Sequence, residues 1–439
     1  MTLNEWIKSA IFWVWDFLTG SSIRKHYVDI KNIMGDRKNP KASKLQEHHL
    51  NNILTYAVEN VAYYKEFRGF SSIRSFPVVN KIIIKNNYEA FQSPEFRGIK
   101  VVNMHTSGST GTPFVVRQDK NKRDRVQAER NYLWGTAGFQ TGMRYVFFRV
   151  LSSMNRYSRL DSWLRNVLLW DVQKLDKENL EKIRNTLKSA RNIRMLIGYA
   201  NTFEILTNYL LACGDSPEMF GLFTIISYGE ALSKGTHDKL RRIFHCNIAA
   251  MYSNQENGMM AIECIENKEF HVNSASYYFE LLKMDSDDPV SVGEPGRIVV
   301  TDLFNHAMPL IRYDTGDIGI WKEKAECGWD SQVFSSIQGR MTDLIFDTKG
   351  NTITPHIISL LMWPYDKLLQ YQFIQEGAKQ YTIKLNESEG CYEDASFVKL
   401  FKDVLGQDAE IVIERVHEIP VLESGKRKEV VRNYNPGKA

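Results

Sequence analysis

The residues with the clearest chemical potential lie at positions 101–116, in the sequence VVNMHTSGSTGTPFVV. Two runs rich in apolar and β-branched residues predict two strands, and the small and hydroxyl residues between them predict the connecting loop. Gly108 and Gly111 allow the backbone to approach a ligand closely, and the neighbouring hydroxyls add hydrogen-bond donors at short reach. Such a loop suits a bound polyphosphate, and it also fits a plain Ser- and Gly-rich hairpin turn. It is not a Walker A loop, because no lysine follows Gly111.

Two further stretches follow predicted strands, at the positions where α/β sheets hold ligands. The sequence YGEAL at 228–232 follows an apolar run at 223–227, and YSNQENG at 252–258 follows a run at 247–252. Within the second stretch, Glu256 offers a carboxylate that can hold Mg²⁺ beside a triphosphate. Each stretch on its own also fits an ordinary strand-to-helix turn or a solvated acidic loop.

Three later stretches carry charge on short turns. In YDTGD at 313–317, an aspartate can accept hydrogen bonds from both hydroxyls of a ribose, or can cap its own β-turn. GRMTD at 339–343 opens the second predicted domain and is a candidate hinge. ESGKRK at 423–428 carries lysines that could reach an anionic transition state when a domain closes, or could form a solvated tail.

The elements that must position these residues alternate along the chain. Strand and helix patterns follow one another at short spacing between 145 and 252, which predicts an α/β sheet with parallel segments. Residues 270–325 contain short apolar runs separated by Gly, Pro and Asp, which predicts an antiparallel β region. The predicted fold class is therefore α/β, with a large N-terminal domain at 1–340 and a small, mobile α+β domain at 341–439.

Residues 1–20 predict a helix that ends at Gly20 and is apolar around most of its circumference. A helix of this kind is more often packed on its own domain, which is the interpretation we favour. The alternative is contact with a membrane surface or a partner protein, because three tryptophans lie close to Arg24 and Lys25. The apolar stretch at 10–18 is interrupted by Asp16 and is too short to span a bilayer, which needs roughly 20 apolar residues.

Charge and cysteine content argue against several classes of function. The net charge of +4 is small for 439 residues and no long Lys/Arg block is present, so nucleic-acid binding is not indicated. The five cysteines are widely spaced and contain no C-x-x-C, which supports neither a zinc ribbon nor a disulfide framework. We therefore expect a cytoplasmic protein, with peripheral membrane association as the alternative raised by the N-terminal helix.

The order and spacing of these stretches resemble the adenylate-forming superfamily of acyl-CoA synthetases, peptide-synthetase adenylation domains and luciferases. Within it, the chain is most similar to the branch of phenylacetate–CoA ligases and CapK-like proteins. The most specific signature is HTSGSTGTP at 105–113, followed in the expected order by YGEAL, YSNQENG, YDTGD and GRMTD. Two further segments, SFPVVNKIII at 75–84 and LIGYANTFEIL at 196–206, are similar to those that precede the phosphate loop and the adenine-binding turn of the family.

The resemblance implies the adenylate-forming fold and a two-step ligase reaction that uses ATP and Mg²⁺. A carboxylate attacks the α-phosphate of ATP, which gives an acyl-adenylate and pyrophosphate. The acyl group then passes to a thiol, such as that of coenzyme A, or to an amine or hydroxyl. CapK-like members are associated with capsule or surface-polysaccharide genes, so an amide-forming ligase that acts on a uronic acid or amino acid is the second enzyme hypothesis. A catalytically degenerate nucleotide-binding relative is the hypothesis from outside the enzymes.

The resemblance also assigns roles to residues of this chain. Lys426, on the small lid domain, would bridge the substrate carboxylate and the α-phosphate, and Glu256 would ligate Mg²⁺. Tyr252 would stack on adenine, while Asp317 and Arg340 would bind the ribose hydroxyls. The remaining ATP contacts would come from Ser107, Gly108, Ser109, Thr110, Gly111, Gly229, Glu230, Ala231 and Ser253.

The chain departs from the family pattern in three places. Ser253 adds a side chain where the family has none, and Gln255 replaces a threonine. Thr342 occupies a hinge position that is usually acidic. Lys426 and Lys428 are alternative catalytic lysines, and we favour Lys426 because a glycine precedes it.

Overall fold

The computed structural model describes most of the chain, namely residues 1–35, 40–106, 114–151, 156–172, 175–229, 231–327, 329, 331–338, 345–350, 352–353, 358, 361–362, 365, 368–387, 392–420 and 428–434. The chain divides into two compact units. Unit 1 comprises Met1–Leu232 and Thr236–Ile337, and unit 2 comprises Ser233–Gly235 and Gln338–Ala439. The division thus falls after Ile337, whereas the sequence predicts a boundary after residue 340.

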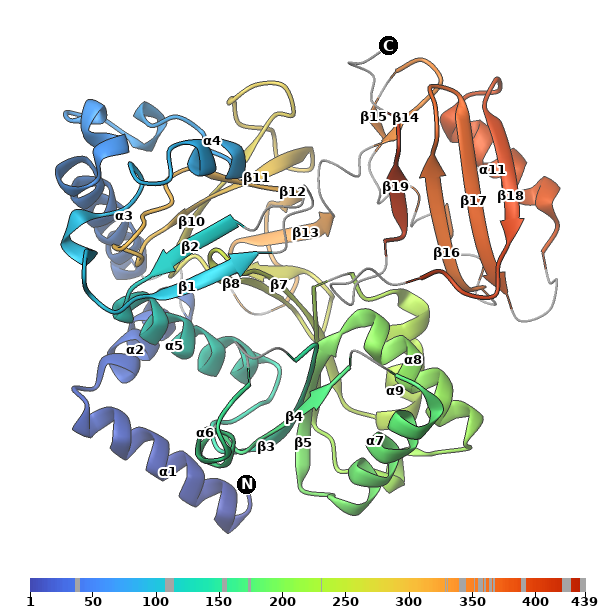
Figure 1. The fold of residues 1–439 in the computed structure, drawn as a ribbon, viewed down its shortest axis with the longest axis horizontal. Helices are drawn as coiled ribbons and strands as arrows, with labels where there is room; N and C mark the ends of the chain where they lie inside the picture. The colour runs from blue at the N-terminus through green and yellow to red at the C-terminus, as the bar shows by residue number, and fades with distance from the viewer. Residues whose placement is uncertain are drawn as a thin grey trace. The chain divides into compact units, whose positions relative to one another are not determined.

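Unit 1 is built on one large mixed sheet (Figure 1). Among the described residues, eleven strands join it in the order β10-β11-β12-β13-β9-β8-β7-β6-β5-β3-β4. The strands from β4 to β7 run parallel, whereas the β7–β8, β8–β9, β10–β11 and β11–β12 pairs are antiparallel. The predicted α/β class, with a parallel and an antiparallel region, is confirmed. The sequence patterns do not reveal that both regions belong to one continuous sheet.

The strands of this sheet are β3 (Arg144–Arg149), β4 (Val167–Asp171), β5 (Ile193–Tyr199), β6 (Thr224–Tyr228), β7 (Asn247–Asn254), β8 (Gly258–Glu263), β9 (Phe270–Val272), β10 (Tyr277–Leu282), β11 (Pro295–Asp302), β12 (Tyr313–Lys322) and β13 (Val333–Gln338). The α-helices up to residue 244 are α1 (Leu3–Leu18), α2 (Ser22–Met34), α3 (Pro40–Asn60), α4 (Lys81–Asn86), α5 (Lys120–Thr136), α6 (Arg159–Leu164), α7 (Lys177–Ser189), α8 (Ala200–Ala212) and α9 (Lys234–Phe244). Short 3₁₀ helices cover Ala62–Phe67, Ile73–Ser75, Pro94–Phe96 and Pro217–Met219.

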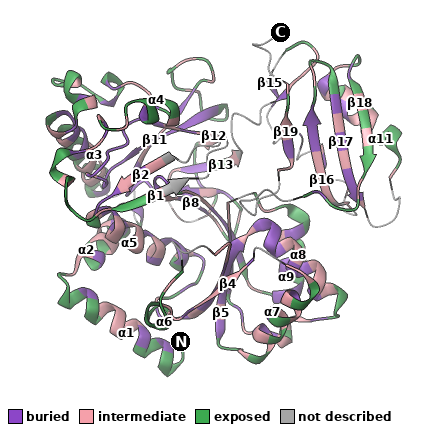
Figure 2. Ribbon diagram, viewed as in Figure 1, coloured by how far each residue is buried: buried purple, intermediate pink, exposed green. Residues whose placement is uncertain are grey.

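Helices cover both faces of the parallel region. Alternate side chains of each strand point to opposite faces of the sheet, so each strand contributes to a core on either side. On β5, Met195 and Ile197 belong to a core that includes Trp134 of α5. Leu196, between them, belongs to the core formed with α7, α8 and α9. The central strands β5 and β6 are accordingly almost wholly buried, whereas β4 at the end of the sheet is mostly half-buried (Figure 2). This three-layer arrangement leaves the carboxyl edge of the parallel strands as the place where loops gather.

Unit 2 contains a four-stranded sheet and one described helix. The strands are β16 (Leu368–Gln375), β17 (Gln380–Glu387), β18 (Glu410–Arg415) and β19 (Val430–Arg432), in the order β18-β17-β16-β19, and the helix is α11 (Asp394–Leu405). Two shorter strands, β14 (Ile345–Phe346) and β15 (Thr352–Ile353), pair with each other. Phe373 of β16 stacks on Phe401 of α11 with ring centroids 5.3 Å apart, inside a core of its own. The predicted small α+β region is therefore confirmed as a fold.

The N-terminal helix α1 forms as predicted, but the expectation that its apolar circumference packs on its own domain is wrong. Phe12 and Trp13 do contact the core of unit 1. Most of the other apolar side chains are exposed, and the exposed fractions reach 63% for Trp6 and 57% for Trp15. Within the described residues, no helix is long and apolar enough to cross a membrane.

The three charged residues of α1 are buried, and their contacts explain its inverted orientation. Asp16 accepts backbone hydrogen bonds from Ile23 and Arg24 at 2.9 Å each, and so caps the start of α2. Lys8 donates to the Trp163 carbonyl at 2.6 Å. Glu5 completes a capping box with Thr2 at the start of the helix. Glu5 also lies 3.4 Å from Arg194 Nε. All three charged residues therefore have partners elsewhere in unit 1, so this side of α1 faces the protein and the apolar side faces outward.

Candidate functional site

The predicted strand–loop–strand unit around 101–116 is confirmed as a β-hairpin. Strands β1 (Val102–Thr106) and β2 (Phe114–Gln118) pair antiparallel, with Thr106 opposite Phe114. Its connecting loop, with the predicted phosphate-binding residues, lies outside the described residues. The predicted site residues outside the described part of the chain are Ser107, Gly108, Ser109, Thr110, Gly111, Glu230, Arg340 and Lys426.

The base of this hairpin is tied to the segment that carries Glu256. Gln118, at the end of β2, donates through Nε2 to the backbone carbonyl of Glu256 at 2.9 Å. Arg123 holds the other end of the same amide by donating to Oε1 at 2.9 Å. Because Gln118 is buried and pinned from both sides, it fixes the stem of the hairpin against the turn that follows β7.

The YSNQENG stretch forms the end of β7, a tight turn and the start of β8. A register shift between Tyr252 and Ser253 marks a bulge there, which re-aims the side chains beyond it. The turn closes at Gly258, which has a positive φ of 121°. A Cβ atom at Gly258 would lie 3.0 Å from the Tyr277 hydroxyl oxygen, so glycine is required for the close packing of this turn.

The YDTGD stretch departs from the prediction of a free turn, because it lies within strand β12. The pairing of β12 with β11 is shifted between Arg297 and Val299, and Gly316 takes a positive φ of 79° in the resulting bulge. Asp314 accepts from Arg297 at 2.6 Å and from the backbone of Gly316 at 2.9 Å. Asp314 therefore has the structural, turn-capping role that the sequence left open, and Asp317 is the remaining candidate for a ligand contact.

Tyr252 and Asp317 are brought together from β7 and β12. The Tyr252 hydroxyl donates to Asp317 Oδ2 at 2.7 Å and lies 3.2 Å from Thr315 Oγ1. Burial, and then the charge of Asp317, raise the pKa of Tyr252 well above its ordinary value. The phenol stays protonated across the physiological range, so it acts as a donor that fixes the Asp317 carboxylate.

Glu256 is buried and held by two donors. Tyr313 donates to Glu256 Oε1 at 3.0 Å, and Lys81 Nζ lies 2.6 Å from the same oxygen. Burial and the charge of Glu256 raise the pKa of Tyr313 well above its usual range, so Tyr313 also remains a donor. Glu256 as a whole is only 2% exposed, and Lys81 supplies the positive charge that makes the burial of its carboxylate tolerable.

Lys81 is the functional candidate that sequence reasoning missed, although the SFPVVNKIII stretch contains it. That stretch docks beside β12: Val79 donates to the Arg312 carbonyl at 3.0 Å, and Asp314 donates back to Val79 at 2.8 Å. Asn80 then caps α4, which begins at Lys81. The docked backbone places Lys81 beside Glu256, and only the pairing of these distant segments reveals the contact.

The remaining described candidates lie at the carboxyl edge of the parallel strands. Tyr228 of β6 is in register with Met251 of β7, so Gly229 and Tyr252 follow neighbouring positions on adjacent strands. Gly229 has a positive φ of 87°, which allows the chain to turn away sharply from β6. Ala231 lies two residues further along and is exposed, whereas Ser253 is half-buried in β7.

In unit 2, Lys428 lies two residues before β19, and its backbone carbonyl accepts from Gln372 at 2.9 Å. In unit 1, the described arrangement joins an aromatic ring, a hydrogen-bonded aspartate and a buried carboxylate at one edge of a sheet. A carboxylate is the type of oxygen ligand that Mg²⁺ prefers, so the side chain of Glu256 fits such an ion by its donor chemistry.

Comparison with known proteins agrees with this reading of the fold. Residues 345–433 match the family model of the CapK C-terminal domain. The chain is 21% identical over 440 residues to Protein CapK of Staphylococcus aureus, covering 95% of this chain and 94% of that protein. It is 24% identical over 396 residues to a phenylacetate–coenzyme A ligase of Thermus thermophilus, covering 84% of this chain and 86% of that protein.

Among solved structures, the fold is similar to that of 2-hydroxyisobutyryl-CoA ligase in its postadenylation state in complex with R3-HIB-AMP. The TM-score is 0.73 with 15% sequence identity, and the match covers 91% of this chain and 90% of that chain. The fold class expected from the motifs is thereby confirmed as that of adenylate-forming ligases. In its motifs, its C-terminal domain match and its relatives, this chain is similar to the CapK-like and phenylacetate–CoA ligase-like branch of the adenylate-forming proteins.

Proposed function

We propose that this protein activates a carboxylic acid with ATP as an acyl-adenylate and then transfers the acyl group to an acceptor. The acceptor is a thiol, with coenzyme A as the first candidate, or an amine or hydroxyl. The similarity to a protein named CapK supports a role in surface-polysaccharide assembly, where the acid would be a uronic acid, an amino acid or a small organic acid. The cysteine pattern supports a cytoplasmic enzyme.

One observation carries the proposal: the hydrogen bond of 2.7 Å between Tyr252 and Asp317. These are the residues that the family resemblance assigns to the adenine ring and to the ribose of the same nucleotide. They come from strands β7 and β12, and the bond holds the two side chains next to each other. If the bond had only a structural role, Asp317 would have no need to lie near the turn that carries Glu256.

The first step requires a weak nucleophile to attack a polyanion. A carboxylate oxygen of the acid forms a bond to the α-phosphorus, and the bond from that phosphorus to the bridging oxygen of the β-phosphate breaks. The electron pair leaves with pyrophosphate. We assign the grip on the leaving pyrophosphate to the loop residues Ser107, Ser109 and Thr110, with Gly108 and Gly111 shaping the loop. Neutralising charge is the main task of the site, and we assign part of it to Lys426.

The metal that this chemistry uses is Mg²⁺, which neutralises phosphate charge when it is bound. Glu256 would be its protein ligand. Lys81 and Tyr313 both contact the Oε1 oxygen of Glu256 and so orient the carboxylate without any ion. Gly229, Glu230, Ala231 and Ser253 would line the nucleotide and acyl side of the site, and Arg340 would share the ribose with Asp317.

The experiment is ATP–pyrophosphate exchange with a panel of arylacetic, hydroxy, uronic and amino acids. We expect wild-type protein to catalyse exchange with at least one class of acid. The Glu256→Gln variant, which lacks the proposed Mg²⁺ ligand, should lose this exchange activity. Adding coenzyme A or hydroxylamine to the productive acid then distinguishes a thiol acceptor from an amine acceptor. ATP binding without exchange for every acid would instead support the degenerate nucleotide-binding relative and would overturn the proposal.

A further inference from the structure

A cluster of metal-ligating side chains lies in unit 1, away from the proposed site, at the far ends of β8 and β12. Cys264 follows β8, His271 lies in β9 and Cys327 lies shortly after β12. One ligand atom from each of the three residues lies within 4.8 Å of the other two. The Cys327 sulfur is 3.3 Å from His271 Nε2. We propose that these three side chains bind one transition-metal ion, with Zn²⁺ as the best-suited ion.

The donor set and its spacing fit zinc. Thiolate and imidazole ligands bind Zn²⁺ at about 2.3 and 2.0–2.1 Å, so a tetrahedral ion separates a sulfur and a nitrogen by roughly 3.5 Å. The observed separation of 3.3 Å needs little adjustment to accept the ion. The two cysteines and one histidine leave a fourth position, which solvent can occupy. Zinc sites with three protein ligands are a common type.

The histidine is oriented as a metal ligand is. Its Nδ1 atom is hydrogen-bonded to the Ser331 hydroxyl, which leaves Nε2 facing the Cys327 sulfur. The ring is fully buried and lies against the Trp329 ring, with centroids 4.2 Å apart. A hydrogen bond to the distal nitrogen commonly fixes the orientation of metal-binding histidines. The ring therefore needs no rearrangement to bind.

The backbone segments that carry the cysteines are also tied together. Cys264 and Glu269 close the β8–β9 turn through a backbone hydrogen bond of 2.7 Å. The Glu269 carboxylate accepts from Lys322 and, at 3.1 Å, from the backbone of Glu326, the residue before Cys327. A bound ion would therefore join the β8–β9 turn to the end of β12, the strand that carries Asp317.

The test measures the metal itself. The full chain, freed of any histidine tag, is analysed for metal by mass spectrometry, and we expect about one zinc ion per chain. Cys264→Ser and Cys327→Ser should each lower the zinc content at least about ten-fold, while Cys213→Ser, an exposed and distant cysteine, should retain it. Circular dichroism checks that each variant is folded.

A second measurement covers the case in which a variant does not fold. Metal-free wild-type protein is titrated with Co²⁺, and thiolate-to-cobalt charge-transfer absorption is expected at an equimolar end point. The proposal is overturned if wild-type protein holds no metal and shows no such absorption. It is equally overturned if mass spectrometry without reductant finds a disulfide between Cys264 and Cys327 in the active protein.

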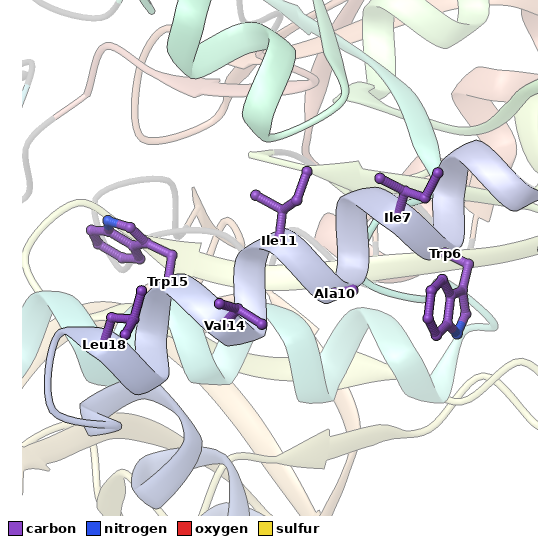
Figure 3. A pocket seen from close by; sticks show the side chains of 7 residues that line it. All are labelled: Trp6, Ile7, Ala10, Ile11, Val14, Trp15 and Leu18. Atoms are coloured by element: carbon purple, nitrogen blue, oxygen red, sulfur yellow. The ribbon is translucent and has the colours of Figure 1, made fainter.

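A different observation concerns the N-terminal apolar face, defined by Trp6, Ile7, Ala10, Ile11, Val14, Trp15 and Leu18 of α1. These positions form two adjacent rows at i, i+4 spacing, and Ile7, Ile11 and Trp15 project to the same side of the helix (Figure 3). The charged side chains of α1 are all buried, so this face carries no charge. We infer that the face binds the surface of a bilayer that contains anionic phospholipids.

The face continues onto its neighbour, because α1 contacts α6. Leu160 and Trp163 of α6 are 66% and 54% exposed, and Lys8 Nζ lies 3.0 Å from the centroid of the Trp163 ring where the two helices meet. Tryptophan and leucine side chains on one face are typical of helices that lie in the membrane interface. An apolar patch of this kind on a soluble domain marks an interaction site.

The charges around this face favour a lipid surface over a second copy of the chain. Arg24 and Lys25 on α2 are exposed directly after α1. Arg159 and Arg165, at the two ends of α6, are also exposed, and Asp161 is the exposed acid of that helix. An uncharged apolar centre with a predominantly basic border complements anionic headgroups. Two such basic borders brought face to face in a symmetric dimer would repel each other.

The test is flotation with vesicles of phosphatidylcholine alone or mixed with phosphatidylglycerol. We expect binding to the mixed vesicles that weakens as salt rises. Trp15→Glu and Ile7→Glu should each reduce the bound fraction at least about ten-fold, because a charge enters the apolar face. Val292→Glu, at a position 59% exposed elsewhere in unit 1, is the matched control and should bind like wild type.

The midpoint of thermal unfolding checks that these variants remain folded, and sedimentation gives the oligomeric state. The inference fails if wild-type protein does not float with the mixed vesicles. It also fails if Trp15→Glu floats like wild type, or if the chain is a dimer that Trp15→Glu converts to a monomer. The last result would assign the face to a second copy.

Discussion

Lys81 Nζ lies 2.6 Å from Oε1 of Glu256, so the first residue of α4 neutralises a carboxylate on the turn after β7. The Glu256 side chain is 3% exposed and that of Lys81 is 35% exposed. Removing the lysine leaves an uncompensated charge in a buried place, whereas removing both partners does not. The pair is thus both a structural contact and a means by which the proposed metal ligand is oriented.

We predict that Lys81→Met lowers the free energy of unfolding by about 2 kcal/mol, because Glu256 then lacks its counter-charge. The control is Lys85→Met on the same short helix, an exposed position where the change should stay within about 0.5 kcal/mol. Urea unfolding measures both. The double variant Lys81→Met/Glu256→Gln should recover part of the loss, and a purely additive result would contradict the pairing.

Tyr252→Phe keeps the aromatic ring and removes the hydrogen bond to Asp317. We expect the KM for ATP to rise by roughly five- to twenty-fold with a smaller change in kcat, because the aspartate loses its fixed position while the stacking surface remains. Tyr209→Phe removes a similar tyrosine–carboxylate bond, to Glu181, and should leave the KM unchanged. The KM for ATP of both variants is measured by steady-state ATP–pyrophosphate exchange. Equal effects of the two variants would show that Tyr252 does not belong to the nucleotide site.

The loop at 107–113 and the late lysines should act on different parts of the reaction. Thr110→Ala combined with Ser109→Ala should slow adenylation at least about a hundred-fold and slow transfer from a preformed acyl-adenylate much less, because the lost contacts hold the leaving pyrophosphate. Rapid-quench measurements of both half-reactions test this. Equal slowing of the two half-reactions would show that the loop does not hold the leaving group.

The same assay separates the two candidate lysines. We expect Lys426→Ala to abolish adenylation while retaining transfer, since its charge is needed only while negative charge builds up at the α-phosphate. Lys428→Ala, two residues away and next to β19, should retain most of both activities. The reverse result would assign the catalytic role to Lys428.

Acid should destabilise the protein through His26. Burial, and then the charge of Arg125, lower the pKa of His26 to about 4 from 6.5, although Asn121, Asp29 and Asp124 act in the opposite direction. The unfolded chain then binds a proton between pH 6.5 and 4 that the folded chain does not, so stability falls as pH falls through this window.

We expect His26 to contribute roughly 2–3 kcal/mol to the change across this window, so that the change is smaller by this amount in His26→Gln, which retains the contribution of His271. His48→Gln, at an exposed position, should behave like wild type. Urea unfolding at several pH values measures the difference. A His26→Gln variant with the same pH dependence as wild type would show that other groups dominate.

Sequence patterns predicted much of the fold because they report local preference. The apolar runs at 223–227 and 247–252 lie within a few residues of β6 and β7, and the alternation of elements indicated an α/β sheet, although β4 was not predicted. The hairpin at 102–118 followed from two β-branched runs around small residues. The motif letters were also sufficient to name Tyr252, Glu256 and Asp317, since their order along the chain resembles that of a known family.

Contacts between distant segments could not be predicted in this way. Asp314 and Asp317 look equivalent in YDTGD, and only the bulge in β12 assigns Asp314 to a turn and Asp317 to Tyr252. In the sequence, Lys81 is simply a lysine before an apolar run. Only the docking of its segment along β12 brings it to Glu256. Strand order and register decide such pairs, and both depend on the packing of the whole sheet.

By itself, the sequence therefore predicted which residues are candidates for the chemistry and many of the local elements that hold them. The tertiary structure decided which of those residues meet. It brought Lys81 to Glu256, and it gathered Cys264, His271 and Cys327, whose spacing in the chain matches no zinc motif. It also decided that α1 faces outward with its apolar side, because Glu5, Lys8 and Asp16 contact Arg194, the Trp163 carbonyl and the backbone of α2 on the protein side.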